Sequence, residues 1–233
     1  KINRKLQKAQ MEYLTEILGK EKLDKLLPES SVGNPTITNF QYRTSHNTIH
    51  HLHHLAKFSQ SVGVVLENIQ SVTEWGGGYG NFARIFLRIN PRATYTIIDL
   101  PIFSFIQALY LSTVFGHEKI NIISNVNHDI QKEKINIIPL NEGVLRKLAL
   151  SKTELFVSTW ALSESSEYAQ RFVKASSFFN ADYLLLAHQE NSQYFPFAES
   201  IAEPLTAYDV IYHKKIPLLK NNYYLFCKRK QGD

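Results

Sequence analysis

The sequence has little of several features that define other classes of protein. Among its 233 residues Cys227 is the one cysteine, so an internal disulfide and a disulfide-stabilised secreted fold are excluded. Long apolar runs are also missing. The best candidate for a membrane span, 96–115, is interrupted by Asp99 and Pro101, which a buried strand followed by a helix explains better. Residues 1–10 are polar and lack the apolar centre of a signal peptide, so we expect a cytoplasmic protein without a membrane span.

What is present is typical of a folded domain. Hydrophobic residues make up 44% of the chain, with 14 Phe and 12 Tyr, and a disordered chain would be poorer in such residues. The formal net charge of +5 suggests nucleic acid or a membrane surface as a partner. The positive charge lies mostly in 1–25 and 214–230, however, whereas the candidate site described below carries carboxylates. Nucleic acid is therefore not a partner that we expect.

The chain divides into two parts by its pattern of apolar residues. Residues 1–70 indicate amphipathic helices with an irregular segment at 30–38, and the last of these helices covers about 48–66. Residues 71–233 indicate alternating strands and helices. We expect the first part to be a helical N-terminal cap or lid, and the second part to be the cofactor-binding domain.

The second part follows the order β-α-β-α-β and ends in two strands joined by a turn. The expected strands are 71–75, 95–100, 154–159, 183–187, 210–216 and 223–228, with the third main strand at either 120–123 or 135–140. The expected helices are 81–89, 101–115, 164–178 and about 197–205. This order predicts an α/β fold, a doubly wound Rossmann-like sheet with a C-terminal antiparallel hairpin and with ligands at the carboxyl ends of its strands.

A glycine-rich loop follows the first of these strands. Segment 73–81 reads Thr-Glu-Trp-Gly-Gly-Gly-Tyr-Gly-Asn, leaves an apolar strand and opens a helix, which is the setting of a nucleotide-binding loop. Gly76 and Gly78 lack a Cβ atom, so the backbone can turn sharply and approach a ligand. Gly80 permits close packing where the helix begins. A glycine cluster at a strand–helix turn is also a common structural feature, so the neighbouring residues must decide between the two interpretations.

Two carboxylates near the loop allow us to choose between the candidate cofactors. The pyrophosphate of a dinucleotide favours a helix N-terminus, but Glu74, two residues before the first glycine, would repel it. The same carboxylate would attract the sulfonium and amino groups of S-adenosylmethionine. Asp99 ends the second strand about 20 residues after the loop, where it can accept hydrogen bonds from both ribose hydroxyls or, alternatively, cap the next helix. Together these residues favour S-adenosylmethionine over NAD.

These segments resemble a known family. Segment 74–81 together with 97–101, Ile-Ile-Asp-Leu-Pro, is similar to the sugar O-methyltransferase family within the Rossmann-like S-adenosylmethionine-dependent methyltransferases. Segment 158–164, Ser-Thr-Trp-Ala-Leu-Ser-Glu, is similar to that family's Asn-Thr-x-Ser-x-Ser-Glu-Met segment, from which Ser158, Ala161 and Ser165 depart. The resemblance covers about 72–230. It implies an enzyme that transfers a methyl group from S-adenosylmethionine to a hydroxyl of a sugar or glycoconjugate.

The predicted cofactor site combines the glycine loop with residues that follow the second and fourth strands. Its members are Glu74, Gly76, Gly78, Tyr79, Gly80, Asp99, Leu100 and Trp160. Tyr79 and Trp160 are also candidates for contact with the acceptor, because aromatic faces suit sugar rings.

Methyl transfer is an in-line displacement, in which orientation supplies much of the rate and a positioned base assists a weakly nucleophilic hydroxyl. Three residues are candidates for that base. Glu164 follows the fourth strand, although a carboxylate there is also favoured by the dipole of a helix. His188 follows the fifth strand, where it can instead bond the backbone of a loop. His50 belongs to a cluster of histidines on the predicted helix of the cap.

The histidine cluster at 46–54 invites a metal interpretation. His50 and His54 would share one helix face. The run His-His-Leu-His-His lacks the glutamate of the zinc-protease motif and has no cysteine nearby, and magnesium prefers carboxylate oxygens. We therefore expect no metal site. A lid helix with one active histidine, or histidines that are only packed or solvated, are the alternatives.

Other functions stay open at this stage. They are a methyltransferase that acts on another small molecule or on nucleic acid, and a non-catalytic nucleotide-binding module. The Asn/Asp-Pro-Pro-aromatic segment that often accompanies methylation of a flipped base does not occur in the sequence. A nicotinamide oxidoreductase is disfavoured by Glu74. The expected partner is a small-molecule or glycan acceptor, and assembly into a homo-oligomer is left open.

Overall fold

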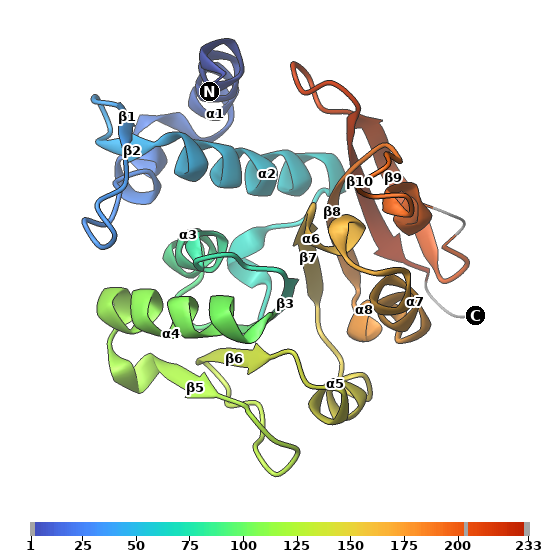
Figure 1. Ribbon diagram of the computed structural model, residues 1–233. Coiled ribbons are helices and arrows are strands. Elements are labelled where there is room, and N and C mark those ends of the chain that lie inside the picture. The colour runs from blue at the N-terminus through green and yellow to red at the C-terminus, as the bar shows by residue number, and fades with distance from the viewer. Residues whose placement is uncertain (1–2, 203–204, 231–233) are drawn as a thin grey trace.

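The computed structural model describes residues 3–202 and 205–230, and an eight-stranded sheet forms its centre (Figure 1). The strands are β3 (Ser71–Trp75), β4 (Thr94–Asp99), β5 (Ile120–Ile122), β6 (Ile135–Pro139), β7 (Leu155–Thr159), β8 (Tyr183–Gln189), β9 (Tyr208–Lys215) and β10 (Asn222–Arg229). Their order is β5-β6-β4-β3-β7-β8-β10-β9. All pairs from β5 to β8 are parallel, whereas β10 is antiparallel to both β8 and β9. The C-terminal hairpin therefore extends an otherwise parallel sheet.

Helices cover both faces of this sheet. They are α1 (Arg4–Leu26), α2 (His46–Val62), α3 (Asn81–Ile89), α4 (Pro101–Phe115), α5 (Glu142–Leu148), α6 (Ala161–Glu164), α7 (Glu167–Ala175) and α8 (Ser177–Asn180). One hydrophobic core joins α2, α3 and α4 to one face, and a second core joins α5, α7 and α8 to the other. Neighbouring strand residues enter opposite cores, as Ile97 and Ile98 do, because side chains alternate along a strand. The predicted doubly wound Rossmann-like fold is confirmed.

A buried ion pair joins the N-terminal part to α3. Arg84 on α3 donates to the Glu29 carboxylate and to the Thr48 hydroxyl, both at 2.8 Å, and to the backbone oxygen of Pro28 at 3.1 Å. The side chains of Arg84 and Glu29 are 0% and 4% exposed. Because a buried charge is stable only with partners, this network fixes the start of α2 beside α3. The small β1 (Ile37–Asn39) and β2 (Thr44–Ser45) pair in this same segment.

Local signals explain where the N-terminal helices begin and end. The hydroxyl of Ser45 accepts a hydrogen bond from the N–H of Thr48, which starts α2 two residues before the expected position. Gly63, with a φ of 74°, ends α2 before the expected end near 66. Gly19, with a φ of 70°, interrupts α1 and divides it into two helical segments.

Two expectations for the second part need correction or completion. A single helix over 164–178 is wrong, because Ser166 and Ser176 accept hydrogen bonds from backbone N–H groups and start α7 and α8 as separate helices. Both candidates for the third main strand form strands: β6 pairs with β4, and β5 lies outside it at the edge. In the segment expected to be helical at about 197–205, Ala198–Ala202 forms a 3₁₀ turn, and 203–204 lie outside the described residues.

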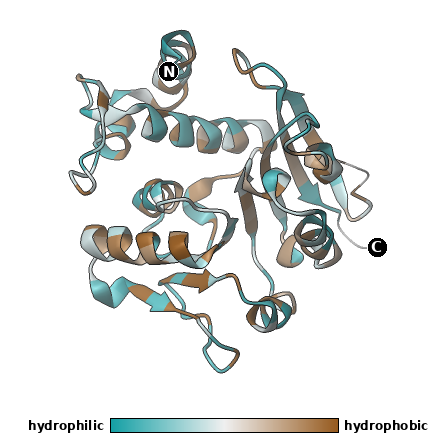
Figure 2. Ribbon diagram, in the orientation of Figure 1, coloured by the Kyte–Doolittle hydropathy of each residue, from teal (hydrophilic) through white to brown (hydrophobic). Residues whose placement is uncertain are grey.

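The apolar stretch 96–115 forms the end of β4 and the whole of α4, as a buried strand followed by a helix. Within residues 3–202 and 205–230, no helix has the length and apolar character needed to cross a membrane. Figure 2 shows α4 as one of the most hydrophobic helices. Several of its apolar side chains are exposed, among them Phe105 (62%) and Leu109 (57%).

Candidate active site

The glycine loop joins β3 to α3. Gly76, Gly78 and Gly80 have φ values of 78°, 57° and 95°, which residues with a side chain rarely adopt. A Cβ atom on Gly76 would lie 2.0 Å from the Cβ atom of Ala161, and one on Gly80 would lie 2.8 Å from a methyl carbon of Leu111. A Cβ atom on Gly78 would meet no atom within 4 Å. The loop is therefore closed against the protein at two glycines and open at Gly78, where a ligand has room to approach.

Asp99, at the end of β4, holds this loop. Its Oδ2 accepts hydrogen bonds from the N–H of Gly78 at 3.1 Å and from Nε2 of Gln107 at 2.8 Å, and its Oδ1 accepts from the N–H of Leu100 at 2.8 Å. Burial raises the pKa of Asp99, and the hydrogen bonds from Leu100 and Gly78 oppose that shift. The alternative interpretation as a helix cap is wrong, since α4 begins after Leu100 without a side-chain cap. Asp99 instead connects β4 to the open glycine.

Glu74 lies behind the loop. Its side chain is 2% exposed, and its Oε2 accepts a hydrogen bond from the hydroxyl of Tyr95 at 2.9 Å. A Cβ atom on Gly77 would lie 3.2 Å from the same oxygen, so the carboxyl group is close to the loop backbone. Burial raises the pKa of Glu74 to about 8, although the hydrogen bond from Tyr95 lowers it. The group is therefore mostly protonated at pH 7, and a cation nearby would favour its ionised form.

Leu100 and Tyr79 flank the open part of the loop. Leu100 follows Asp99 and is 52% exposed, so it offers an apolar surface. Tyr79 packs edge-to-face on Tyr110 of α4, with ring centroids 5.1 Å apart. Burial raises the pKa of Tyr79 to about 12. Tyr79 and Asn47 line the same cavity. The glycine loop and the start of α2 therefore border one cavity.

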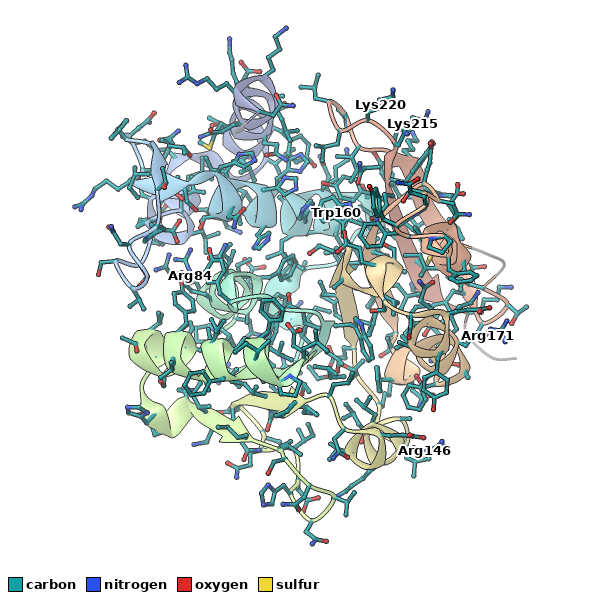
Figure 3. The ribbon with its side chains drawn as sticks, viewed as in Figure 1. Arg84, Arg146, Trp160, Arg171, Lys215 and Lys220 are labelled. Atoms are coloured by element: carbon teal, nitrogen blue, oxygen red, sulfur yellow. The ribbon has the colours of Figure 1, made fainter. Side chains whose placement is uncertain are left out.

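Trp160 follows β7 in a strained conformation, with a φ of 68°. Its indole N–H donates to the side-chain oxygen of Asn222 at 2.5 Å. Its ring stacks on His50 of α2, with centroids 5.5 Å apart and an interplanar angle of 14°. Figure 3 labels Trp160 near α2 and the central strands. The structure therefore brings two of the predicted site residues, Trp160 and His50, into contact.

His50 is held from several sides. Its Nδ1 lies 2.6 Å from the amide nitrogen of Gln10 on α1. Its ring stacks on His46 at 5.8 Å and meets His54 edge-to-face at 4.2 Å, so His50 and His54 share a helix face as predicted. Burial, together with smaller contributions from His51 and other neighbouring histidines, lowers the pKa of His50 to about 3. The ring is consequently neutral across the physiological pH range.

The orientation of the Gln10 amide decides which His50 nitrogen carries the proton. When the amide nitrogen donates to Nδ1, the proton of the neutral ring is on Nε2. The oxygen of that amide is buried and has no hydrogen-bond partner among the described residues. A half-turn of the amide places this oxygen against an Nδ1–H group and leaves a free lone pair on Nε2. The two arrangements make His50 a donor or an acceptor toward a ligand.

The other two candidate bases lie apart from this contact. His188 on β8 is 2% exposed and stacks on Tyr223 at 5.5 Å. Burial lowers its pKa, and its Nε2 is buried without a partner in the described part of the chain. It is two residues from Leu186, so it points to the sheet face opposite α2. Glu164 ends α6 and is exposed. The structure does not bring the three candidates together.

Three residues of this region were not predicted as site residues. Gln107 is fully buried in α4 and donates to both Asp99 and the backbone oxygen of Gly78. A glutamine within an apolar helix is a usable signal, because a buried amide needs a polar partner. Tyr95 and Gln10 gave no such signal, since neither belongs to a motif.

The histidines of α2 contact other side chains of the fold. Within the described residues, no group of three or more His, Cys, Asp or Glu side chains is arranged to hold a metal ion. His51 and His54 instead pair with Asn81 and with the Tyr224 hydroxyl, at 3.1 and 2.6 Å. Arg84, labelled in Figure 3, lies next to the glycine loop and is paired with Glu29, whereas the labelled Arg146, Arg171, Lys215 and Lys220 lie at the periphery.

Comparison with known proteins supports the fold. No protein-family model and no curated protein matches the sequence. Among solved structures, an O-methyltransferase family protein from Burkholderia thailandensis has a TM-score of 0.53 at 16% identity, over 99% of this chain and 71% of that chain. Magnesium protoporphyrin IX methyltransferase (ChlM) from Synechocystis PCC 6803, solved with bound SAM, has a TM-score of 0.55 at 11% identity. The match covers 96% of this chain and 97% of that chain.

The chain spans only 58% of the length of another match, the pyocyanin biosynthetic protein PhzM. At these identities the likeness establishes a Rossmann-type methyltransferase fold. The activity of a methyltransferase stays a prediction, because the likeness shows the fold alone. The sugar-specific part of the resemblance stays a prediction.

Proposed function

We propose that this chain is an S-adenosylmethionine-dependent O-methyltransferase that acts on a hydroxyl of a sugar or glycoconjugate. The observation that carries the proposal is the glycine loop, which is open at Gly78 and tied to Asp99 within a methyltransferase-type fold. S-adenosylmethionine, when bound, supplies a methyl group on a sulfonium. Gly78, Asp99 and Leu100 are the residues that we assign to hold it, with Glu74 behind the loop.

The acceptor side of the proposal rests on different residues. Segment 158–164 resembles the corresponding segment of sugar O-methyltransferases, and the Trp160 ring lies beside His50. An aromatic face suits the C–H groups of a sugar ring. We assign 71–233 to the cofactor-binding domain and 1–70 to a cap over the acceptor, which is supported by the stacking of His50 on Trp160.

Among the candidate bases, His50 is the one that the geometry favours, because it contacts Trp160 and stays neutral. A base with a pKa of about 3 is weak. The hydroxyl proton, however, becomes far more acidic as the new oxygen–carbon bond forms, so a weak base at Nε2 can accept it. This role requires the amide oxygen of Gln10 to accept from Nδ1–H. Gln10 is then a positioning residue for His50.

A calorimetric titration tests the cofactor assignment. The protein is titrated separately with S-adenosylmethionine, S-adenosylhomocysteine and NAD. Binding of the first two without NAD is the expected result, and binding of NAD alone, or of none of the three, would overturn the proposal. Transfer of a labelled methyl group to a panel of glycosides then tests the reaction.

Replacing Gly78 with alanine should weaken S-adenosylmethionine binding with little effect on folding. The new methyl group has free space in the protein, so the cost to folding is that of a left-handed conformation, about 1–2 kcal/mol. Cofactor affinity should fall by about tenfold or more, because a side chain there blocks close approach to the backbone. Calorimetry and thermal unfolding measure the two effects.

Gly63 provides the matched control for this substitution. It has a φ of 74°, and a Cβ atom there also meets nothing within 4 Å, but it lies at the end of α2. G63A should cost similar stability and leave cofactor affinity unchanged. Equal cofactor affinity in G78A and G63A would show that the open side of the loop is not a binding surface.

Binding of S-adenosylmethionine at pH 7 should release a proton from Glu74. The pKa of this group is about 8 in the free protein, and a nearby cation lowers it, so binding converts the acid to its carboxylate. Affinity should therefore rise with pH up to about pH 8 and level off above it. Calorimetry in buffers with different ionisation enthalpies measures the number of protons released on binding.

The E74Q variant isolates this contribution, because the cofactor's own amino group also titrates. The glutamine keeps the shape of the side chain and removes the titration. Identical proton release by wild type and E74Q would show that Glu74 does not sense the cofactor.

A further inference from the structure

A cavity of about 670 Å³ lies beside the glycine loop, between the cap and α4. Segment 32–47 of the cap forms one wall, Ile106, Leu109 and Tyr110 of α4 form another, and Tyr79 lies in the lining. This volume is in the range that holds a small organic ligand. The proposed function assigns no role to it.

The lining of this cavity suits an apolar, uncharged group. None of the described residues in it is Asp, Glu, Lys or Arg. Several of its polar groups already have partners in the protein: Thr38 accepts from Gln7, Ser45 accepts from the N–H of Thr48, and Thr113 donates to a backbone oxygen of α4. A sugar placed here would lose its water and find few partners in exchange, which is costly.

Exposed apolar side chains on α4 adjoin the cavity. Leu109 is 57% exposed and Ile106 is 38% exposed, and both line it. A ligand that removes apolar surface of this kind from water gains roughly 25 cal/mol of binding free energy per Å² of area buried. The hydrophobic stretch of α4 is visible in Figure 2.

The cavity is also connected to the proposed base. His46 lines it and stacks on His50, one helical turn further along, with ring planes at 16°. His50 in turn stacks on Trp160. The Nδ1 atom of His46 is buried without a hydrogen-bond partner among the described residues, and burial lowers the pKa of His46. The ring thus adds a neutral, flat surface between the cavity and His50. His46 is therefore the residue that lies between the cavity and the proposed base.

We propose that this cavity binds the apolar, uncharged portion of the acceptor, and that the acceptor is a glycoside with an apolar aglycone. A sugar phosphate would meet no Lys or Arg side chain in the described lining, and a free sugar has no apolar group to fill it. This inference rests on the proposed function, since it specifies the substrate of the same site.

Two glucosides that differ only in the aglycone test it. 2-Naphthyl β-glucoside and methyl β-glucoside are titrated into the protein saturated with S-adenosylhomocysteine, and into the protein alone. The naphthyl compound should bind about tenfold or more tightly than the methyl compound, because its ring buries apolar surface in the cavity. The L109R variant places a charge in the cavity wall and should abolish that difference.

F105R is the matched control. Phe105 lies on the same helix and is exposed to a similar extent, 62% against 57% for Leu109, but it is outside the cavity lining. The preference for the naphthyl compound should persist in F105R within about twofold, as expected for a surface substitution away from the site. Equal binding of the two glucosides by wild type, absence of naphthyl glucoside binding, or equal loss in L109R and F105R would each overturn the inference.

The cofactor titration keeps the two proposals distinguishable. If S-adenosylmethionine does not bind but the naphthyl preference depends on Leu109, the proposed function fails and the ligand class of the cavity stands. If S-adenosylmethionine binds and neither variant alters glucoside binding, the function stands and the cavity proposal fails.

Discussion

Replacement of His50 by phenylalanine should lower kcat for methyl transfer by about 10²–10⁴-fold, the usual contribution of a positioned base. Phenylalanine retains a flat ring against Trp160 and removes both nitrogens. The affinity for S-adenosylmethionine should change little, because His50 is not among the residues that we assign to the cofactor. Single-turnover measurement of labelled methyl transfer separates the two effects.

His53 is the matched control for His50. It lies on the same helix, and burial likewise lowers its pKa, to about 4, but it contacts Tyr13 and Tyr224 rather than Trp160. H53F should retain kcat within about twofold, as expected when the reacting groups are untouched. Loss of activity in E164Q or H188F with full activity in H50F would transfer the role of base to another of the three candidates.

The pH dependence gives an independent test of this role. Because burial lowers the pKa of His50 to about 3, the active neutral form of its ring persists well below pH 6.5. The profile of kcat against pH should therefore show no fall near the ordinary histidine pKa of about 6.5. In Q10E a carboxylate replaces the amide beside Nδ1, and an opposite charge raises the pKa of His50. In this variant the fall of kcat at acidic pH should begin at a higher pH than in the wild type. An unchanged pH profile in Q10E would show that Gln10 only packs α1 against α2.

Replacement of Asp99 by alanine should weaken S-adenosylmethionine binding by about 10- to 150-fold. This corresponds to the loss of hydrogen bonds to a charged group, about 1.5–3 kcal/mol. Part of this loss is expected to come from a less well fixed glycine loop, because Asp99 accepts hydrogen bonds from the Gly78 N–H and from Gln107. Calorimetry with S-adenosylmethionine measures the total.

A cofactor analogue separates the two contributions of Asp99. D99A should weaken the binding of S-adenosylmethionine more than that of its 2′-deoxy analogue if the carboxylate contacts the ribose. Equal weakening of both would mean that Asp99 acts only by holding the loop. D99N, which keeps an acceptor for the Gly78 N–H but lacks the charge, should bind with intermediate affinity. Unchanged affinity in D99A would remove Asp99 from the site.

Much of the fold follows from local signals. The predicted bounds 71–75, 81–89 and 101–115 agree with β3, α3 and α4, because the glycine loop and Pro101 mark where these elements begin or end. The prediction fails at 164–178, where two serines cap new helices within an otherwise helical pattern. The sequence left the choice between 120–123 and 135–140 open, because two similar apolar strands differ only in which neighbours they pair with.

The sequence by itself determined the glycine loop and the position of its acidic partner. Glycines at fixed spacing after a strand, and Asp99 at the end of the next strand, follow from backbone geometry and leave a local pattern. The tertiary structure alone decided the rest: that Glu74 is buried and mostly protonated, that His50 lies between Gln10 and Trp160, and that a cavity separates the cap from α4. These features depend on burial and on contacts between residues far apart in the chain. Neither leaves a periodic signature in the sequence, because each arises only when separate elements pack together.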